Sequence, residues 1–94
     1  MSEWNFLTKH ARALVCISED PGISLRDIAT ALGITERNAF TIVNDLNAAG
    51  YVVKEKDGRR NRYHIQPHMP LREAVGREQT IGELLALLVD PTSG

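Results

Sequence analysis

A short turn between two amphipathic segments constrains the fold of this chain most strongly. Gly33, Ile34 and Thr35 separate two stretches whose apolar residues recur at helical spacing. Glycine ends a helix easily because it adopts left-handed backbone, and a threonine side chain can cap the helix that follows. A turn this short, with a glycine in it, sets two helices at a steep angle, as in a helix-turn-helix. We therefore expect a helix-turn-helix at the centre of the chain.

The residues around this turn fix where its two helices begin and end. Ser24, followed by Asp27, is a variant of the capping box and opens the first helix. Thr35 opens the second, which Gly50 ends in the left-handed conformation. The second helix therefore spans 35–49.

The helix over 35–49 has one apolar side and one small, polar side. At 100° per residue, its apolar residues point in one inward direction. These residues are Ala39, Ile42, Val43 and Leu46. The opposite side presents Arg37, Thr41, Asn44 and Ala48, flanked by Asn38, Phe40 and Asp45. A helix with such an outer side fits into a groove of DNA.

A hairpin is expected directly after this helix. The period of apolar residues changes from 3.6 to 2 over 51–56, and a second strand is expected over 61–65. Asp57 and Gly58 form the predicted turn, with a longer, mobile tip at Arg59 and Arg60. Together with a helix that starts after Thr8, this order predicts an α+β, mostly α, winged helix-turn-helix: a three-helix core, a β-hairpin wing and a C-terminal helix.

The chain divides into three parts. Residues 1–66 are the predicted winged helix-turn-helix domain, and 67–79 are a proline-containing linker with a short helix. Thr80 and Glu83 form a full capping box that opens a final helix over 80–90, which is apolar nearly all round.

Positive charge is concentrated in the middle of the chain. The formal net charge is −1, yet residues 35–64 carry six Lys and Arg against four Asp and Glu. Arg59, Arg60 and Arg62 lie within four positions, and planar guanidinium groups suit phosphate or a narrow minor groove. An anionic partner is therefore expected to meet the centre of the chain.

These motifs resemble winged helix-turn-helix transcriptional regulators of the MarR/ArsR-like bacterial group. The resemblance lies in LRDIA (25–29), LGIT (32–35), VNDL (43–46), AGY (49–51) and GRRNRY (58–63), and in WNFLT (4–8), which opens a subset of compact regulators. It implies a cytoplasmic, dimeric, promoter-binding protein, and such regulators are often controlled by a ligand. The chain is shorter than full-length relatives and has little sequence for their long dimerisation helices. A small-molecule effector therefore has no support from its residues.

The expected partner is double-stranded promoter or operator DNA. Arg37 can read guanine N7 and O6 through paired donors, Asn38 can read adenine, and Thr35 can donate to a phosphate. Phe40 either touches a thymine methyl group or packs under the wing. The full predicted DNA-binding set is Ser24, Thr35, Arg37, Asn38, Thr41, Asn44, Arg59, Arg60 and Arg62. The runner-up is a winged-helix module that binds proteins without reading DNA.

A symmetric homodimer is expected from the surplus apolar surface of the first and last helices. Its predicted contacts are Leu7, Leu14, Ile81, Leu84, Leu85 and Leu88. A twofold axis would set the recognition helices about 34 Å apart, on an inverted repeat. The alternative is that the last helix folds back onto the first.

Other function classes find no support in the sequence. Catalytic motifs and phosphate-binding glycine loops are missing, so we expect no enzyme and no cofactor. His10, His64, His68 and Cys16 are too poorly spaced for a metal site, and a Cys16 among apolar neighbours is expected to be inert. The single cysteine, together with the lack of a membrane span or signal peptide, indicates a cytoplasmic protein.

Overall fold

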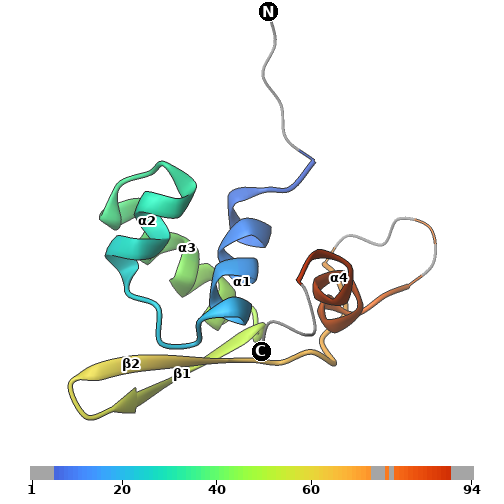
Figure 1. Cartoon of the computed structure of the whole chain (residues 1–94). Helices are drawn as coiled ribbons and strands as arrows, with labels where there is room; N and C mark the ends of the chain where they lie inside the picture. The colour runs from blue at the N-terminus through green and yellow to red at the C-terminus, as the bar shows by residue number, and fades with distance from the viewer. Residues whose placement is uncertain (1–5, 73–75, 77, 90–94) are drawn as a thin grey trace, which may run out of the picture.

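The computed structural model describes residues 6–72, 76 and 78–89. Its elements, in chain order, are α1 (Lys9–Glu19), α2 (Leu25–Leu32), α3 (Glu36–Ala48), β1 (Val52–Asp57), β2 (Arg60–Ile65) and α4 (Ile81–Leu88). Helices α1, α2 and α3 cluster on one side of the long hairpin, and α4 lies beside α1 (Figure 1). The predicted winged helix-turn-helix with an additional C-terminal helix is confirmed.

The predicted helix caps are confirmed at each helix start. The side-chain oxygens of Thr8, Ser24 and Thr35 each accept a backbone N–H three residues later, at 3.1 Å. Thr80 and Glu83 form the full capping box. These bonds satisfy N–H groups that the first helical turn cannot pair, so the helix starts follow from local chemistry.

The turn of the helix-turn-helix has the expected left-handed glycine. Gly33 has φ +70°, and the Ile34 N–H behind it donates to the Ala29 carbonyl at 2.9 Å. Bonds of this kind close the end of a helix and redirect the chain. Only three residues therefore separate α2 from α3, and the two helices pack against each other.

One apolar core joins all the helices to the wing. Its inward residues on α3 are Ala39, Ile42, Val43 and Leu46, the same four that helical spacing predicts. The other buried side chains are Ala13, Leu14, Ile17, Ile28, Ala29, Leu32, Tyr51, Val52, Tyr63, Ile81 and Leu85. The orientation of α3 is thus set by its apolar stripe, which leaves the polar side outward.

The wing is a two-stranded antiparallel hairpin whose turn differs from the prediction. Asp57 pairs with Arg60, so Gly58 and Arg59 alone form the connection. The expected turn at Asp57 and Gly58, with a longer tip, is therefore wrong. Gly58 has φ +65° and occupies the first turn position, which lets the strands pair up to Arg60. At its base, the Tyr63 N–H donates to the Pro21 carbonyl at 2.9 Å and ties the wing to the α1–α2 loop.

The linker folds back on itself and docks α4. The Ile81 N–H donates to the Met69 carbonyl at 2.9 Å, and the Gly82 N–H to the Pro67 carbonyl at 3.0 Å. Pro70 also accepts the Tyr51 hydroxyl at 2.9 Å. The described residues of 67–79 contain no helix, and 73–75 and 77 of the predicted short helix lie outside the described residues.

We predict that Gly82→Ala destabilises the protein by about 1–3 kcal/mol, the usual cost of overpacking. A Cβ at position 82 would lie 2.8 Å from Pro67 Cβ and 2.9 Å from its carbonyl oxygen, and neither atom can swing away. Thermal unfolding followed by circular dichroism would measure the loss. The matched control is Gly22→Ala, whose Cβ meets only a flexible carboxylate oxygen of Asp20 at 3.8 Å. Equal unfolding temperatures for both variants would contradict the docked position of α4.

Candidate nucleic-acid interface

The outer side of α3 is open to solvent along its length. Arg37, Asn38, Thr41 and Asn44 are all exposed, and Phe40 is half-exposed. Among the described residues the apolar core lies on the opposite side of α3, because the four buried apolar residues of the helix point there. The side chains predicted to read bases are therefore available to a partner, and their contact with DNA stays a prediction.

Ser24 and Thr35 stand at the starts of α2 and α3. Each hydroxyl oxygen accepts a backbone N–H, at 3.1 Å, which leaves the hydroxyl hydrogen available. Both residues are exposed. A helix N-terminus also attracts negative charge, since its first N–H groups point outward. These two caps can therefore donate to phosphate groups while they hold the helices.

The two faces of the wing carry different charged residues. Lys54 pairs with Tyr63, whose side chain is buried in the core, so Lys54 lies on the face turned toward the helices. Arg62 pairs with Glu55 on the opposite face. Arg62, although predicted as a DNA contact, thus lies beside an acidic residue. Lys54, and Lys56 two residues further, were missed by sequence reasoning.

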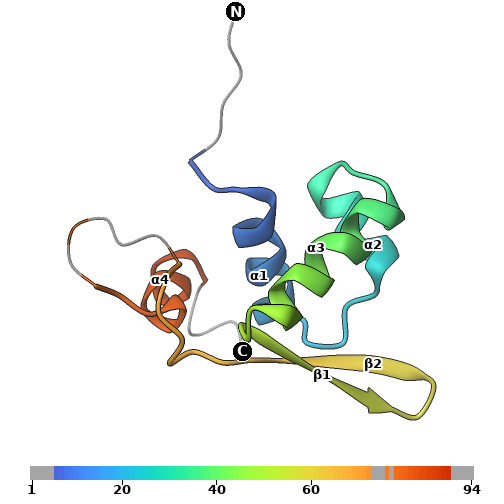
Figure 2. The ribbon, with the colours of Figure 1, turned by 180° about the vertical axis from the view of Figure 1, so that it is seen from behind.

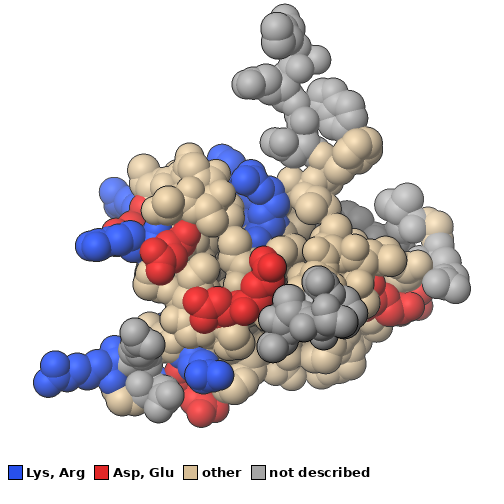
Figure 3. All heavy atoms as spheres, in the orientation of Figure 1, with Lys and Arg blue, Asp and Glu red and all other residues tan. Residues whose placement is uncertain are grey.

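The tip of the wing and the start of α3 lie on the same side of the molecule. Figures 1 and 2, seen from opposite directions, both show the hairpin extending toward the side of the α2–α3 turn. In Figure 3, Lys and Arg side chains gather at two places on this side, over the α2–α3 corner and over the wing. Exposed Arg59 lies in the turn between the strands. Arg60 is the first residue of β2.

Both acidic residues of α3 have a basic partner. Glu36 Oε1 lies 3.4 Å from Arg26 Nε on α2, and Asp45 Oδ2 lies 2.9 Å from His10 Nε2 on α1. Exposed pairs like these contribute only about 0–1 kcal/mol to stability. The Arg26 guanidinium places a positive charge next to the Glu36 carboxylate, and the His10 ring holds the Asp45 carboxylate toward α1.

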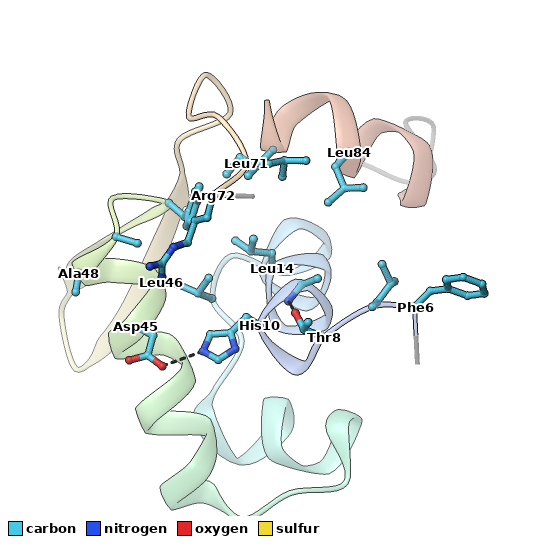
Figure 4. A pocket seen from close by; sticks show the side chains of 15 residues that line it. Phe6, Thr8, His10, Leu14, Asp45, Leu46, Ala48, Leu71, Arg72 and Leu84 are labelled. Carbon is cyan, nitrogen blue, oxygen red and sulfur yellow. Dashed lines mark hydrogen bonds and ion pairs between the residues drawn. The ribbon is translucent and has the colours of Figure 1, made fainter. Parts of the chain in front are cut away.

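An apolar groove of about 1050 Å³ lies on another side of α3, between α1, α3 and α4. Figure 4 shows Leu14 and Leu84 facing it and the His10–Asp45 pair at its edge. Arg72, which is exposed, also lines it. The groove holds none of the residues predicted to contact DNA.

The predicted dimer contacts separate into two groups. Leu14, Ile81 and Leu85 are buried within the protomer, where α4 packs on α1, so they are not available to a second copy. Within the protomer α4 covers α1, as the alternative expected, and the dimer contact stays a prediction. Leu7 and Leu84 are half-buried, and Leu88 is 40% exposed. Leu87, which was not predicted, is 81% exposed.

The residues considered for metal or redox chemistry are not brought together. The described part of the chain holds no group of three or more His, Cys, Asp or Glu side chains able to bind a metal ion. Burial raises the pKa of the Cys16 thiol, and nearby Glu19 raises it further, so the unreactive thiol form is favoured. Within the same described residues, no helix is long and apolar enough to span a membrane.

Comparison with known proteins identifies the family. The family model described as the MarR family matches residues 5–62, which is more than half of the chain and runs from before α1 into β2. No curated protein matches the chain. The match covers the helix-turn-helix and most of the wing, and the winged-helix architecture agrees with it. The chain belongs to the MarR family of winged-helix transcriptional regulators.

Proposed function

We propose that this protein binds double-stranded DNA sequence-specifically, as a homodimer on an inverted repeat, and regulates transcription in the cytoplasm. The observation that carries the proposal is the exposed, small and polar outer side of α3, on the same side of the molecule as the tip of the wing. A convex polar helix beside a basic ribbon is complementary to a major groove and its neighbouring phosphates.

Different residues are proposed to contact the bases and the sugar–phosphate backbone of DNA. Arg37 presents paired donors that match guanine O6 and N7, and Asn38 presents the amide that matches adenine. Thr41 and Asn44 follow on the same exposed side of α3. Ser24, Thr35 and the basic residues of the wing hold phosphates or the minor groove. Phosphate contacts supply affinity, and base contacts supply the sequence preference.

The wing is expected to contribute affinity without sequence preference. We predict that Arg59→Ala weakens binding to every duplex and lowers the slope of log K against log salt by about one, the value for one lost phosphate contact. Fluorescence anisotropy titrations at several salt concentrations would measure both effects. Arg72→Ala removes another exposed arginine, one that lines the groove, and should leave the slope unchanged. If the slope for Arg59→Ala equals that of wild type, Arg59 does not contact the phosphate backbone of DNA.

The proposed dimer forms through α4 and the outer surface of α1. Leu87 and Leu88 are large apolar side chains exposed on α4. A second, smaller depression of about 270 Å³ lies next to Leu88 and has an apolar lining from α1 and α2 that includes Val15, Cys16 and Leu32. A second copy of the chain fits here, because a twofold axis brings the same apolar patch from both protomers together. In Figures 1 and 2, α4 lies away from the tip of the wing, so this contact leaves the proposed DNA surface of each protomer free.

Selection from random duplexes tests the proposal. Purified protein, incubated with a random pool near physiological salt, should enrich one inverted repeat over several rounds. The spacing of its half-sites should be about one helical turn, roughly 34 Å. A pool that stays random would favour the alternative function, a winged-helix module that binds proteins, for which the net charge of −1 is the supporting observation.

A further inference from the structure

Phe40 is an exposed aromatic residue on an otherwise polar surface. It is a residue of α3 and is 50% exposed. The other large hydrophobic side chains exposed among the described residues belong to the N-terminal segment, β1 and α4. Phe40 therefore stands apart from the apolar patch assigned to the dimer.

The neighbours of Phe40 along α3 are the proposed base-reading residues. Arg37 lies three residues before it and Asn44 four residues after it, which are the positions that adjoin a side chain on a helix surface. Both are exposed. Glu36, one turn before Phe40, is paired with Arg26. The exposed part of the ring is thus bordered by polar and charged groups of its own helix.

DNA offers an apolar partner at this depth of the major groove. The C5 methyl group of thymine is the one apolar group that a base edge presents there, and phenylalanine is among the side chains that contact it. An α3 seated deeply enough for Arg37 and Asn44 to reach base edges would bring the ring of Phe40 to the same edges.

We infer that Phe40 reads a thymine by packing its ring against the C5 methyl group, next to the base pair that Arg37 reads. This inference rests on the proposed function and adds to it one specificity-determining residue. Phe40 thereby selects the methyl group itself, so 5-methylcytosine at the same position is also accepted by the ring. The surface of Phe40 that the protomer leaves exposed becomes covered in the complex with DNA.

The test removes one methyl group from the DNA at a time. Each thymine of the selected site is replaced singly by deoxyuridine, which keeps the base pairing and loses only the methyl group. At one position in each half-site, wild-type protein should bind about fourfold more weakly, the factor expected when one methyl group is no longer buried. Phe40→Ala should bind the thymine and deoxyuridine duplexes equally at that position.

Two further measurements separate the contact from other effects. Phe40→Leu keeps an apolar side chain and should retain part of the discrimination between thymine and deoxyuridine. Circular dichroism should show native helix content in both Phe40→Leu and Phe40→Ala. Two further duplexes carry cytosine or 5-methylcytosine at the same position. Wild-type protein should bind the methylated duplex more tightly than the unmethylated one. Phe40→Ala should bind the two duplexes with equal affinity.

The outcomes distinguish this inference from the proposed function. If wild-type protein selects a site but no deoxyuridine weakens its binding, or if Phe40→Ala keeps the same sensitivity, Phe40 does not read thymine and only this inference is overturned. If wild-type protein selects no sequence at all, the proposed function fails and the inference fails with it.

Discussion

Replacing Leu87 and Leu88 together by glutamate is expected to lower affinity for the inverted repeat by about two orders of magnitude. The affinity of a dimer that binds both half-sites exceeds the affinity for one half-site by a factor of about 10²–10⁴, and a monomer loses that gain. Both side chains are exposed in the protomer, so the charges should not disturb its core. In the dimer, by contrast, four carboxylates would be brought into an apolar contact without partners.

Sedimentation and DNA titration together measure this effect. Wild-type protein should sediment as a dimer and the L87E/L88E variant as a monomer with unchanged helix content. A duplex that contains a single half-site is the matched control, because wild-type protein and variant should bind it with similar affinity. A variant that remains dimeric, or that binds the inverted repeat as tightly as wild type, would place the dimer contact elsewhere.

Replacing Arg37 by alanine is expected to cost about 1–3 kcal/mol on the selected site, which is the value of one bidentate contact to a base. The loss should be confined to specific DNA, and one base pair of each half-site should no longer be selected. Competition titrations with single-base variants of the site would measure both effects.

The Arg37→Lys variant is the control for charge alone. Lysine keeps the positive charge but lacks the planar fork of donors that matches guanine. Arg37→Lys should therefore bind random duplexes like wild type and still lose discrimination at the same base pair. If Arg37→Ala keeps the full sequence preference of wild type, recognition does not lie on this side of α3.

Features that depend on a few neighbouring residues could be predicted from the sequence. Thr35 caps α3 and Gly33 ends α2 with φ +70°, as local chemistry requires. The inward stripe of α3 follows from spacing alone, so the exposure of Arg37 and Thr41 could be predicted with it. The candidate interface follows from the same spacing, because it is the side of α3 that stays exposed when the apolar stripe is buried.

Features that depend on distant contacts could not be predicted in the same way. The apolar residues of α4 surround the helix, so spacing could not show that Ile81 and Leu85 are covered by the same protomer while Leu87 is not. The linker sets which side of α4 faces the core, because its Met69 and Pro67 carbonyls accept backbone hydrogen bonds from Ile81 and Gly82. The His10–Asp45 pair joins residues 35 positions apart and has no signature in either segment.

The wing lies between these two cases. Alternation from buried Val52 already places Lys54 and Lys56 on the face of the wing that includes Tyr63, so this pair could have been found from the sequence. The predicted DNA contacts of the wing are instead the three closely spaced arginines, Arg59, Arg60 and Arg62. Arg59 lies in the turn of the wing because Gly58 takes the first position of a two-residue connection, which shortens the tip that the sequence predicted.

A map of the backbone amide chemical shifts that change when the protein binds its selected duplex would test the proposed DNA interface. We expect the largest changes at 35–44 on α3 and at 58–59 in the turn of the wing, with smaller changes on α4. A map in which α4 and the apolar groove shift while α3 and the wing stay unchanged would contradict this expectation, because the partner would then bind a side of the molecule that holds none of the proposed DNA contacts.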